Sequence, residues 1–85
     1  MAALSGKAIE RIKSALLAAF DRAELVQLVR TELDENLEAI AGAGTLDAVV
    51  YDLVLWAERH ERLGDLLAAT QAARPKNAQF AALAA

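Results

Sequence analysis

Few residues of this 85-residue chain have side chains suited to catalysis. His60 is the only histidine and cysteine is absent, so the sequence offers no thiol nucleophile and no thiolate metal site. Glu58, Glu61 and Asp65 lie near His60 in the sequence, but carboxylates without a surrounding pocket are ordinary solvated charge. We interpret His60 as a surface residue at a helix end, where the helix dipole favours its cationic form. The sequence predicts a protein that is not an enzyme and holds no metal.

A glycine-containing turn is the only other candidate for binding chemistry. Gly42-Ala43-Gly44-Thr45 precedes a helical segment, as the phosphate cradle of a nucleotide-binding protein does. No strand precedes these residues, however, and no lysine follows the glycines as in a P-loop. We interpret the segment as a structural turn and expect no cofactor.

Acyl carrier proteins are acidic helical domains of similar size, so a carrier or accessory domain of an enzyme complex is the alternative function. The attachment serine of a carrier follows an aspartate at the start of a helix. Here Ser5 follows Leu4 and Ser14 follows Lys13. The residues therefore favour a binding domain over a carrier.

Charge and hydropathy restrict the possible partners. The formal net charge is -3 with no run of Lys or Arg, which is unfavourable for nucleic acid. Apolar stretches such as Leu53 to Ala57 are far shorter than the roughly 20 residues that span a bilayer. The first residues do not resemble an export signal. We expect a cytoplasmic protein that binds neither nucleic acid nor membrane and has no small-molecule substrate.

Apolar residues recur at helical spacing along most of the chain. A first helix is predicted over 6 to 20. A second begins at Arg22, with Asp21 and Glu24 spaced as a capping box. A third, shorter helix begins after Asp34, whose carboxylate would cap it, and ends by Gly42.

The second half of the chain has the strongest helical pattern. Thr45 is placed to cap a helix over 46 to 60, whose broad apolar surface indicates packing on several sides. A fifth helix runs from Leu63 to near Arg74, and a short sixth follows Pro75 and holds Phe80 and Leu83. The prediction is one all-α domain over residues 1–85, a compact antiparallel bundle of about six helices joined by short connections.

Trp56 and Tyr51 are the aromatic residues whose roles matter most. Trp56 is expected in the core, whereas for Tyr51 the core and an exposed contact surface are equally compatible with the sequence.

Charged residues gather in two places along the sequence. Acidic residues concentrate between the second and third helices, and basic residues lie around the ends of the fifth. The acidic group is Glu32, Asp34, Glu35 and Glu38, and the basic group is Arg59, Arg62, Arg74 and Lys76. Two patches of opposite sign could dock head to tail between domains. Compensation of helix dipoles explains the same distribution, and the sequence leaves both readings open.

Four segments spread over nearly the whole chain carry a specific combination of residues. They are L-L-A-A-F-D-R-A-E-L at 16 to 25, L-D-E-N-L-E-A-I-A at 33 to 41, V-V-Y-D-L-V-L-W-A-E-R at 49 to 59 and R-P-K-N at 74 to 77. In this order they resemble the bacterial effector-associated domain of the first type, a death-like helical module.

The resemblance implies a death-fold-like bundle that couples an effector to a partner with a like domain. We therefore expect an adaptor in a bacterial immune or conflict system that binds like domains on other proteins and is also able to self-associate. Some eukaryotic death-effector relatives carry an R-x-D-L motif, whereas Arg62 and Asp65 here are separated by one residue more. No charge-triad assignment is therefore transferred. From charge and position we predict a protein-interaction site formed by Asp34, Glu35, Glu38, Arg59, Arg62, Arg74 and Lys76.

Overall fold

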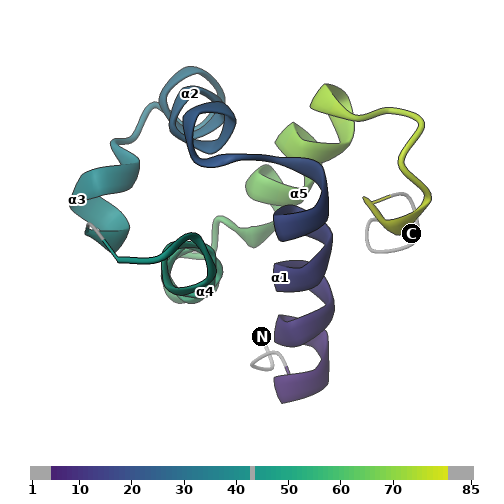
Figure 1. Ribbon diagram of the computed structural model, residues 1–85, viewed down its shortest axis with the longest axis horizontal. Coiled ribbons are helices and arrows are strands. Elements are labelled where there is room, and N and C mark those ends of the chain that lie inside the picture. The colour runs from purple at the N-terminus through teal and green to yellow at the C-terminus, as the bar shows by residue number, and fades with distance from the viewer. Residues whose placement is uncertain (1–4, 43, 81–85) are drawn as a thin grey trace.

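The elements of the fold are α-helices, and Figure 1 shows their order in a computed structural model that describes residues 5–42 and 44–80. The helices are α1 (Gly6–Ala19), α2 (Arg22–Glu32), α3 (Leu37–Ala41), α4 (Leu46–Arg59) and α5 (Leu63–Ala73). Residues 78–80 form a sixth helical segment, while Leu83 lies outside the described residues. The described chain contains no strand, so the all-α prediction is confirmed.

Polar side chains at the helix starts fix where the first four of these helices begin. Asp21 accepts from the Glu24 N–H at 2.8 Å and Glu24 accepts from the Asp21 N–H at 3.0 Å, which confirms the predicted capping box. Thr45 accepts from the Ala48 N–H at 3.2 Å, which confirms the predicted cap of α4. Ser5 caps α1 in the same way. Each cap satisfies an amide that has no partner inside its own helix.

The predicted cap of α3 is wrong. Asn36, not Asp34, accepts the hydrogen bond from the Glu38 N–H, at 3.0 Å. Asp34 has a φ of 55° because it ends α2: the N–H groups of Leu33 and Glu35 both donate to the carbonyl of Val29, which forces a left-handed turn between them. Gly42 follows α3 with a φ of 70°, as predicted for a glycine that ends a helix.

α4 ends in a Schellman motif. The Arg62 N–H donates to the Ala57 carbonyl at 2.7 Å and the Glu61 N–H donates to the Glu58 carbonyl at 3.2 Å. Glu61 follows the end of α4 and has a φ of 57°. This is the left-handed conformation for which the motif usually uses glycine. The motif turns the chain sharply, so that Arg62 begins α5 at a fixed place.

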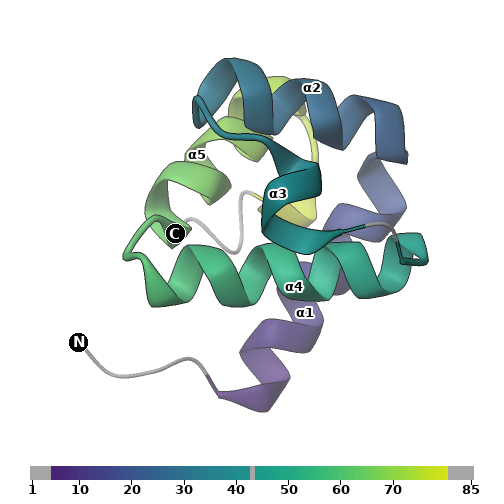
Figure 2. The same cartoon turned by 90° about the vertical axis from the view of Figure 1, so that its left-hand side faces the viewer.

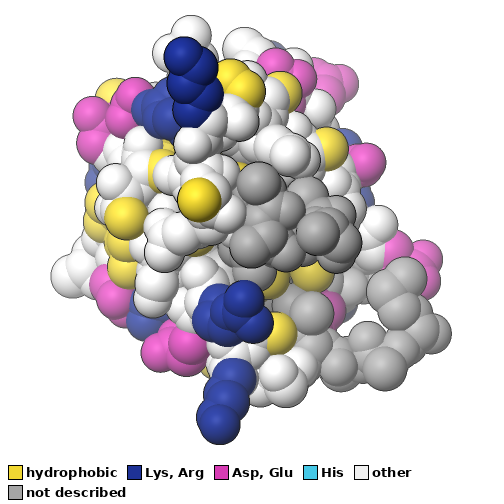
Figure 3. Space-filling model, turned by 90° about the vertical axis from the view of Figure 1, so that its right-hand side faces the viewer, with side chains coloured by type: hydrophobic (Ala, Val, Ile, Leu, Met, Phe, Trp, Pro, Cys, Tyr) yellow, Lys and Arg dark blue, Asp and Glu magenta, His cyan; other side chains and the backbone are white. Residues whose placement is uncertain are grey.

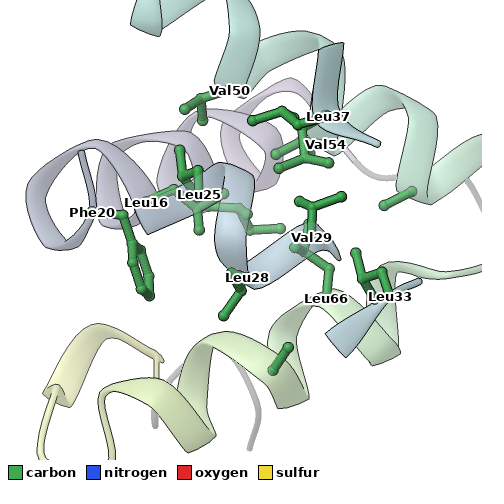
Figure 4. Close-up of a cluster of buried hydrophobic side chains, with 14 of the residues drawn as sticks. Leu16, Phe20, Leu25, Leu28, Val29, Leu33, Leu37, Val50, Val54 and Leu66 are labelled. Carbon is green, nitrogen blue, oxygen red and sulfur yellow. The ribbon is translucent and has the colours of Figure 1, made fainter. Parts of the chain in front are cut away.

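The core is built around α4, which contacts α1, α3 and α5. Its fully buried residues are Val49, Val50, Leu53, Val54 and Ala57. Figure 2 shows α1 crossing behind this helix and α3 directly above it, with α5 at the upper left and α2 at the top, beyond α3. Side chains from all five helices meet in one cluster in Figure 4, among them Leu16, Leu25, Leu37 and Leu66. The broad apolar surface of α4 therefore reflects packing on several sides, as its sequence indicates.

The chain after α5 also contributes to the core. Phe80 is only 1% exposed, and its ring centroid lies 5.9 Å from that of Phe20 at the end of α1. Asn77 accepts hydrogen bonds from the Gln79 and Phe80 N–H groups, which fixes the start of the last helical turn. The bundle measures 30 × 28 × 22 Å. None of the helices in the described residues is long and apolar enough to cross a membrane.

Candidate protein-interaction surface

Arg62 connects the two predicted charge groups directly. Its guanidinium lies 3.3 Å from the Glu35 carboxylate and 3.5 Å from that of Asp65. It also lies 5.7 Å from the centroid of the Trp56 ring, close enough for a cation–π interaction. Arg62 reaches Asp65 in spite of the extra residue between them, because both lie at the start of α5, where residues three apart are neighbours.

This ion pair changes the picture of two separate patches. Glu35 and Arg62 come from opposite groups in the sequence, yet they face each other in one molecule. Asp34 precedes Glu35 and Glu61 precedes Arg62, and both have positive φ angles. Two tightly turned loops are thus joined by one ion pair. We call the region formed by Asp34, Glu35, Glu38, Arg59 and Arg62 the charged corner.

Arg74 is held by contacts within the chain. Its guanidinium lies 2.6 Å from the Glu24 carboxylate and 4.5 Å from the centroid of the Phe20 ring, and it donates to the Ala19 carbonyl at 3.2 Å. The hydrogen bond from the Asp21 N–H, followed by that from Arg74, lowers the pKa of Glu24 from its ordinary value. Arg74 thereby ties the end of α5 to the junction of α1 and α2.

The other predicted site residues remain exposed. Asp34 and Glu38 lie in and after the connection between α2 and α3, Arg59 ends α4, and Lys76 follows α5. Within residues 5–42 and 44–80 no ion pair involves any of these four side chains. They are the members of the predicted set that are available to a partner.

The aromatic residues of α4 differ in exposure. Trp56 is half-buried and packs against the core, and its ring centroid lies 5.3 Å from that of the exposed His60. His60 is the C-cap of α4, a helix-end position as the sequence indicates. Tyr51 is 41% exposed, which resolves the open question about this residue in favour of the surface.

Lys13 is a contact residue that sequence reasoning missed. Its ammonium lies 3.0 Å from the Asp47 carboxylate, 3.5 Å from that of Glu10 and 5.9 Å from the centroid of the Tyr51 ring. The hydrogen bond to Asp47 is the main cause that raises the pKa of Lys13 above its ordinary value. The i, i+3 spacing of Glu10 and Lys13 was visible in the sequence, but the contact with α4 depends on the fold.

The glycine turn before α4 has a structural role. The Arg22 guanidinium donates to the Gly44 carbonyl, and Thr45 caps α4, so the glycine turn connects α2 to the start of α4. Among the described residues no group of His, Asp and Glu side chains could hold a metal ion. On the face shown in Figure 3, basic and acidic side chains are interspersed with apolar ones and neither sign forms a continuous patch.

Comparison with known families decides the relationship that the motifs suggested. The model of effector-associated domain 1 matches residues 2–85. The chain belongs to this family. Effector-associated domains are non-catalytic accessory domains, and the sequence-based identification is confirmed. Comparisons with curated proteins and with solved structures give no match. The candidate surface of this effector-associated domain therefore rests on its own residues alone.

Proposed function

We propose that this effector-associated domain is a non-enzymatic adaptor that recruits or oligomerises effectors through contacts between like domains. Its setting is a bacterial immune or conflict system in the cytoplasm. The partners are like domains on other proteins and further copies of this chain, and not nucleic acids, membranes or small-molecule substrates. Membership of an accessory family supports this function, because such a domain acts through what it binds.

The observation that carries the proposal is the pair between Glu35 and Arg62. This pair holds two loops together, and the exposed side chains of Asp34, Glu38 and Arg59 extend from those loops and the helix ends beside them. A corner with both signs of charge can pair with the same corner of a like domain, acid against base. Oppositely charged surfaces guide association and fix the orientation of the partners. Lys76 and the held Arg74 lie at the opposite end of α5 and would form a separate basic contact.

A charge-exchange experiment tests this surface. Glu38→Lys alone and Arg59→Glu alone should each weaken binding between copies of the domain, whereas a mixture of the two variants should bind, since each then offers the charge that the other lacks. Binding is measured by biolayer interferometry at low and high salt. Arg11→Glu is the matched control, because Arg11 is exposed on α1, which contributes no residue to the charged corner, and makes no ion pair within the described residues.

The expected loss is modest for one charge, because exposed pairs contribute about 0–1 kcal/mol each. Binding of the native domain should also weaken as salt rises. If both single variants bind like the native domain, the charged corner is not the contact surface. If the domain binds neither itself nor like domains from its host, the adaptor function is wrong.

A further inference from the structure

The turn between α4 and α5 is strained and only partly capped. Glu61 has a φ of 57°, which is unfavourable for a residue with a Cβ. Arg62, the N-cap of α5, accepts no hydrogen bond from the first amides of that helix, whereas a side chain caps each of α1 to α4. Both costs would be relieved if α4 continued into α5 as one helix, because those amides would then bond to carbonyls in the last turn of α4.

The sequence across this turn is compatible with a continuous helix. The connections after α3 and α5 contain Gly42 and Pro75, which are residues that stop a helix. The residues from Arg59 to Leu63 include neither glycine nor proline, and arginine, glutamate and leucine are good helix formers. Local preference therefore does not require the chain to turn here.

Tertiary packing explains why the chain nevertheless turns. At 3.6 residues per turn, the buried residues of α4, such as Leu53 and Ala57, and those of α5, such as Leu66 and Ala69, would face about 180° apart on a continuous helix. One body of α1, α2 and α3 could not cover both sets. The turn instead brings α5 back beside α2 (Figure 2). A straight helix would expose the apolar side of α5 and uncover the surface on which it packs.

We infer that the surface of α2 and α4 beneath α5 is also an interface for a second copy of this chain, and that the two copies exchange α5 and the segment up to Phe80. In each copy of this exchanged dimer, α4 and α5 form one long helix. The contacts of α5 away from the turn are recreated between copies, including the Phe20–Phe80 ring contact and the Glu24–Arg74 ion pair. A second copy fits this surface because it brings the same side chains that cover it in the monomer.

The balance between the two forms depends on the turn and on protein concentration. The same apolar side chains are buried in the monomer and in the exchanged dimer, so their burial favours neither form. Relief of the strain at Glu61 in both copies favours the dimer, and the loss of freedom on association opposes it. The inference goes beyond the proposed adaptor function, because core contacts and not the charged corner hold this dimer together.

Substitutions at Glu61 test the role of the turn. Glu61→Gly relieves the strain and weakens a straight helix, whereas Glu61→Ala keeps the Cβ and favours the helix. The native chain and both variants are unfolded in urea, since α5 must leave the core to exchange. They are refolded at about 1 mM protein in about 1 M salt, which screens the charged corner.

Size-exclusion chromatography with light scattering then measures the dimers. We expect the native chain and Glu61→Ala to form dimers. The dimer dissociation constant of Glu61→Gly should be at least about a hundredfold above that of Glu61→Ala, because both chains of the dimer carry the substitution.

A charge exchange across the Glu24–Arg74 pair tests whether α5 crosses between copies. Glu24→Arg and Arg74→Glu each place like charges together in a monomer. When the two variants are refolded together at low salt, a mixed exchanged dimer restores both pairs, since each body receives α5 of the other variant. The control mixture is Lys13→Glu with Asp47→Lys. That pair joins α1 to α4 and lies wholly before the turn, so exchange of α5 restores neither contact.

Native mass spectrometry counts the mixed dimers. Their ratio to dimers of one variant should be at least about tenfold higher for the Glu24 and Arg74 mixture than for the control mixture. Circular dichroism checks that each variant is folded, and the Glu61 variants decide the question if a charge variant is not.

Three results overturn the inference. A native chain that stays monomeric after refolding has no exchanged form. Equal dimerisation of Glu61→Gly and Glu61→Ala shows that the turn does not control the association. Equal shares of mixed dimers in the two mixtures show that α5 does not cross between copies. Each of these results leaves the proposed function standing if Glu38→Lys and Arg59→Glu still alter binding to like domains at low salt.

Discussion

Arg62 lies 3.3 Å from Glu35, a residue 27 positions earlier in the sequence, and so joins the connection between α2 and α3 to the start of α5. Both side chains are partly exposed, at 29% and 43%. Water therefore screens their attraction, and the pair contributes more to the geometry of the two loops than to the free energy of unfolding.

A double-mutant cycle measures this contribution. Arg62→Gln and Glu35→Gln should each lower the free energy of unfolding, and the coupling between them should be about 0.2–1 kcal/mol in urea denaturation. Arg62→Gln should cost more than Glu35→Gln, because it also removes the contacts with Asp65 and the Trp56 ring. Equal costs and a coupling of zero would show that the pair does not hold the corner together.

Replacing Glu61 with glycine should stabilise the domain. Its φ of 57° costs an L-residue roughly 1–2 kcal/mol, and glycine avoids most of this cost. Glu61→Gly should therefore raise the free energy of unfolding by about 1 kcal/mol in chemical denaturation. Glu61→Ala is the control, because it removes the carboxylate and keeps the Cβ. If alanine stabilises as much as glycine, charge and not backbone strain is the cause.

Phe80 should be essential for folding, although it lies near the end of the described chain. Truncating a buried phenylalanine costs about 3–5 kcal/mol. At about 0.05–0.15 kcal/mol per residue, the free energy of unfolding of the whole domain is only about 4–13 kcal/mol. Phe80→Ala should leave a largely unfolded or strongly destabilised chain by circular dichroism, and Phe80→Leu a folded one. A native melting temperature for Phe80→Ala would mean that the ring contact with Phe20 contributes little.

Glu24 should cause part of the loss of folding stability at acidic pH. The Asp21 N–H and then Arg74 hold the pKa of Glu24 below its ordinary value of 4.5, so protons bind more strongly to the unfolded chain. The resulting stability is present above pH 4.5 and is lost as the pH falls through the lower pKa of the folded state. Between pH 6 and pH 2 the melting temperature should fall less steeply with falling pH for Glu24→Gln than for the native chain.

Arg74→Gln separates the two causes in the same series of melts. The substitution removes the hydrogen bond from Arg74, which is the smaller cause, and leaves the hydrogen bond from the Asp21 N–H in place. The fall of melting temperature with pH should therefore be intermediate in steepness between those of the native chain and Glu24→Gln. A slope identical to that of Glu24→Gln would assign the whole effect to Arg74.

Local features of the fold could be predicted because they depend on neighbouring residues. The reciprocal bonds of Asp21 and Glu24, and the cap at Thr45, involve residues three apart, so the sequence spacing was sufficient. Asp34 and Asn36 are both good capping residues and lie two positions apart. Only the left-handed turn that ends α2 decides between them, and it depends on where the Val29 carbonyl finds its donors.

The candidate site could be predicted only in part, because it depends on contacts between distant residues. Charge along the sequence identified Glu35 and Arg62 but assigned them to separate patches, since nothing local indicates that α5 begins beside the end of α2. The contact of Lys13 with Asp47 was not predicted for the same reason. It arises where α1 meets α4, and no sequence motif marks that place.

The position of α4 at the centre of the bundle bears on how such a scaffold can diversify. Because this helix carries the packing of α1, α3 and α5, substitutions at its buried residues should damage the fold. The outward faces of the surrounding helices can then change charge and shape at little cost in stability. Under the proposed adaptor function, a single architecture of this kind could supply several adaptor and effector pairs within one cell, each kept apart from the others by its surface alone.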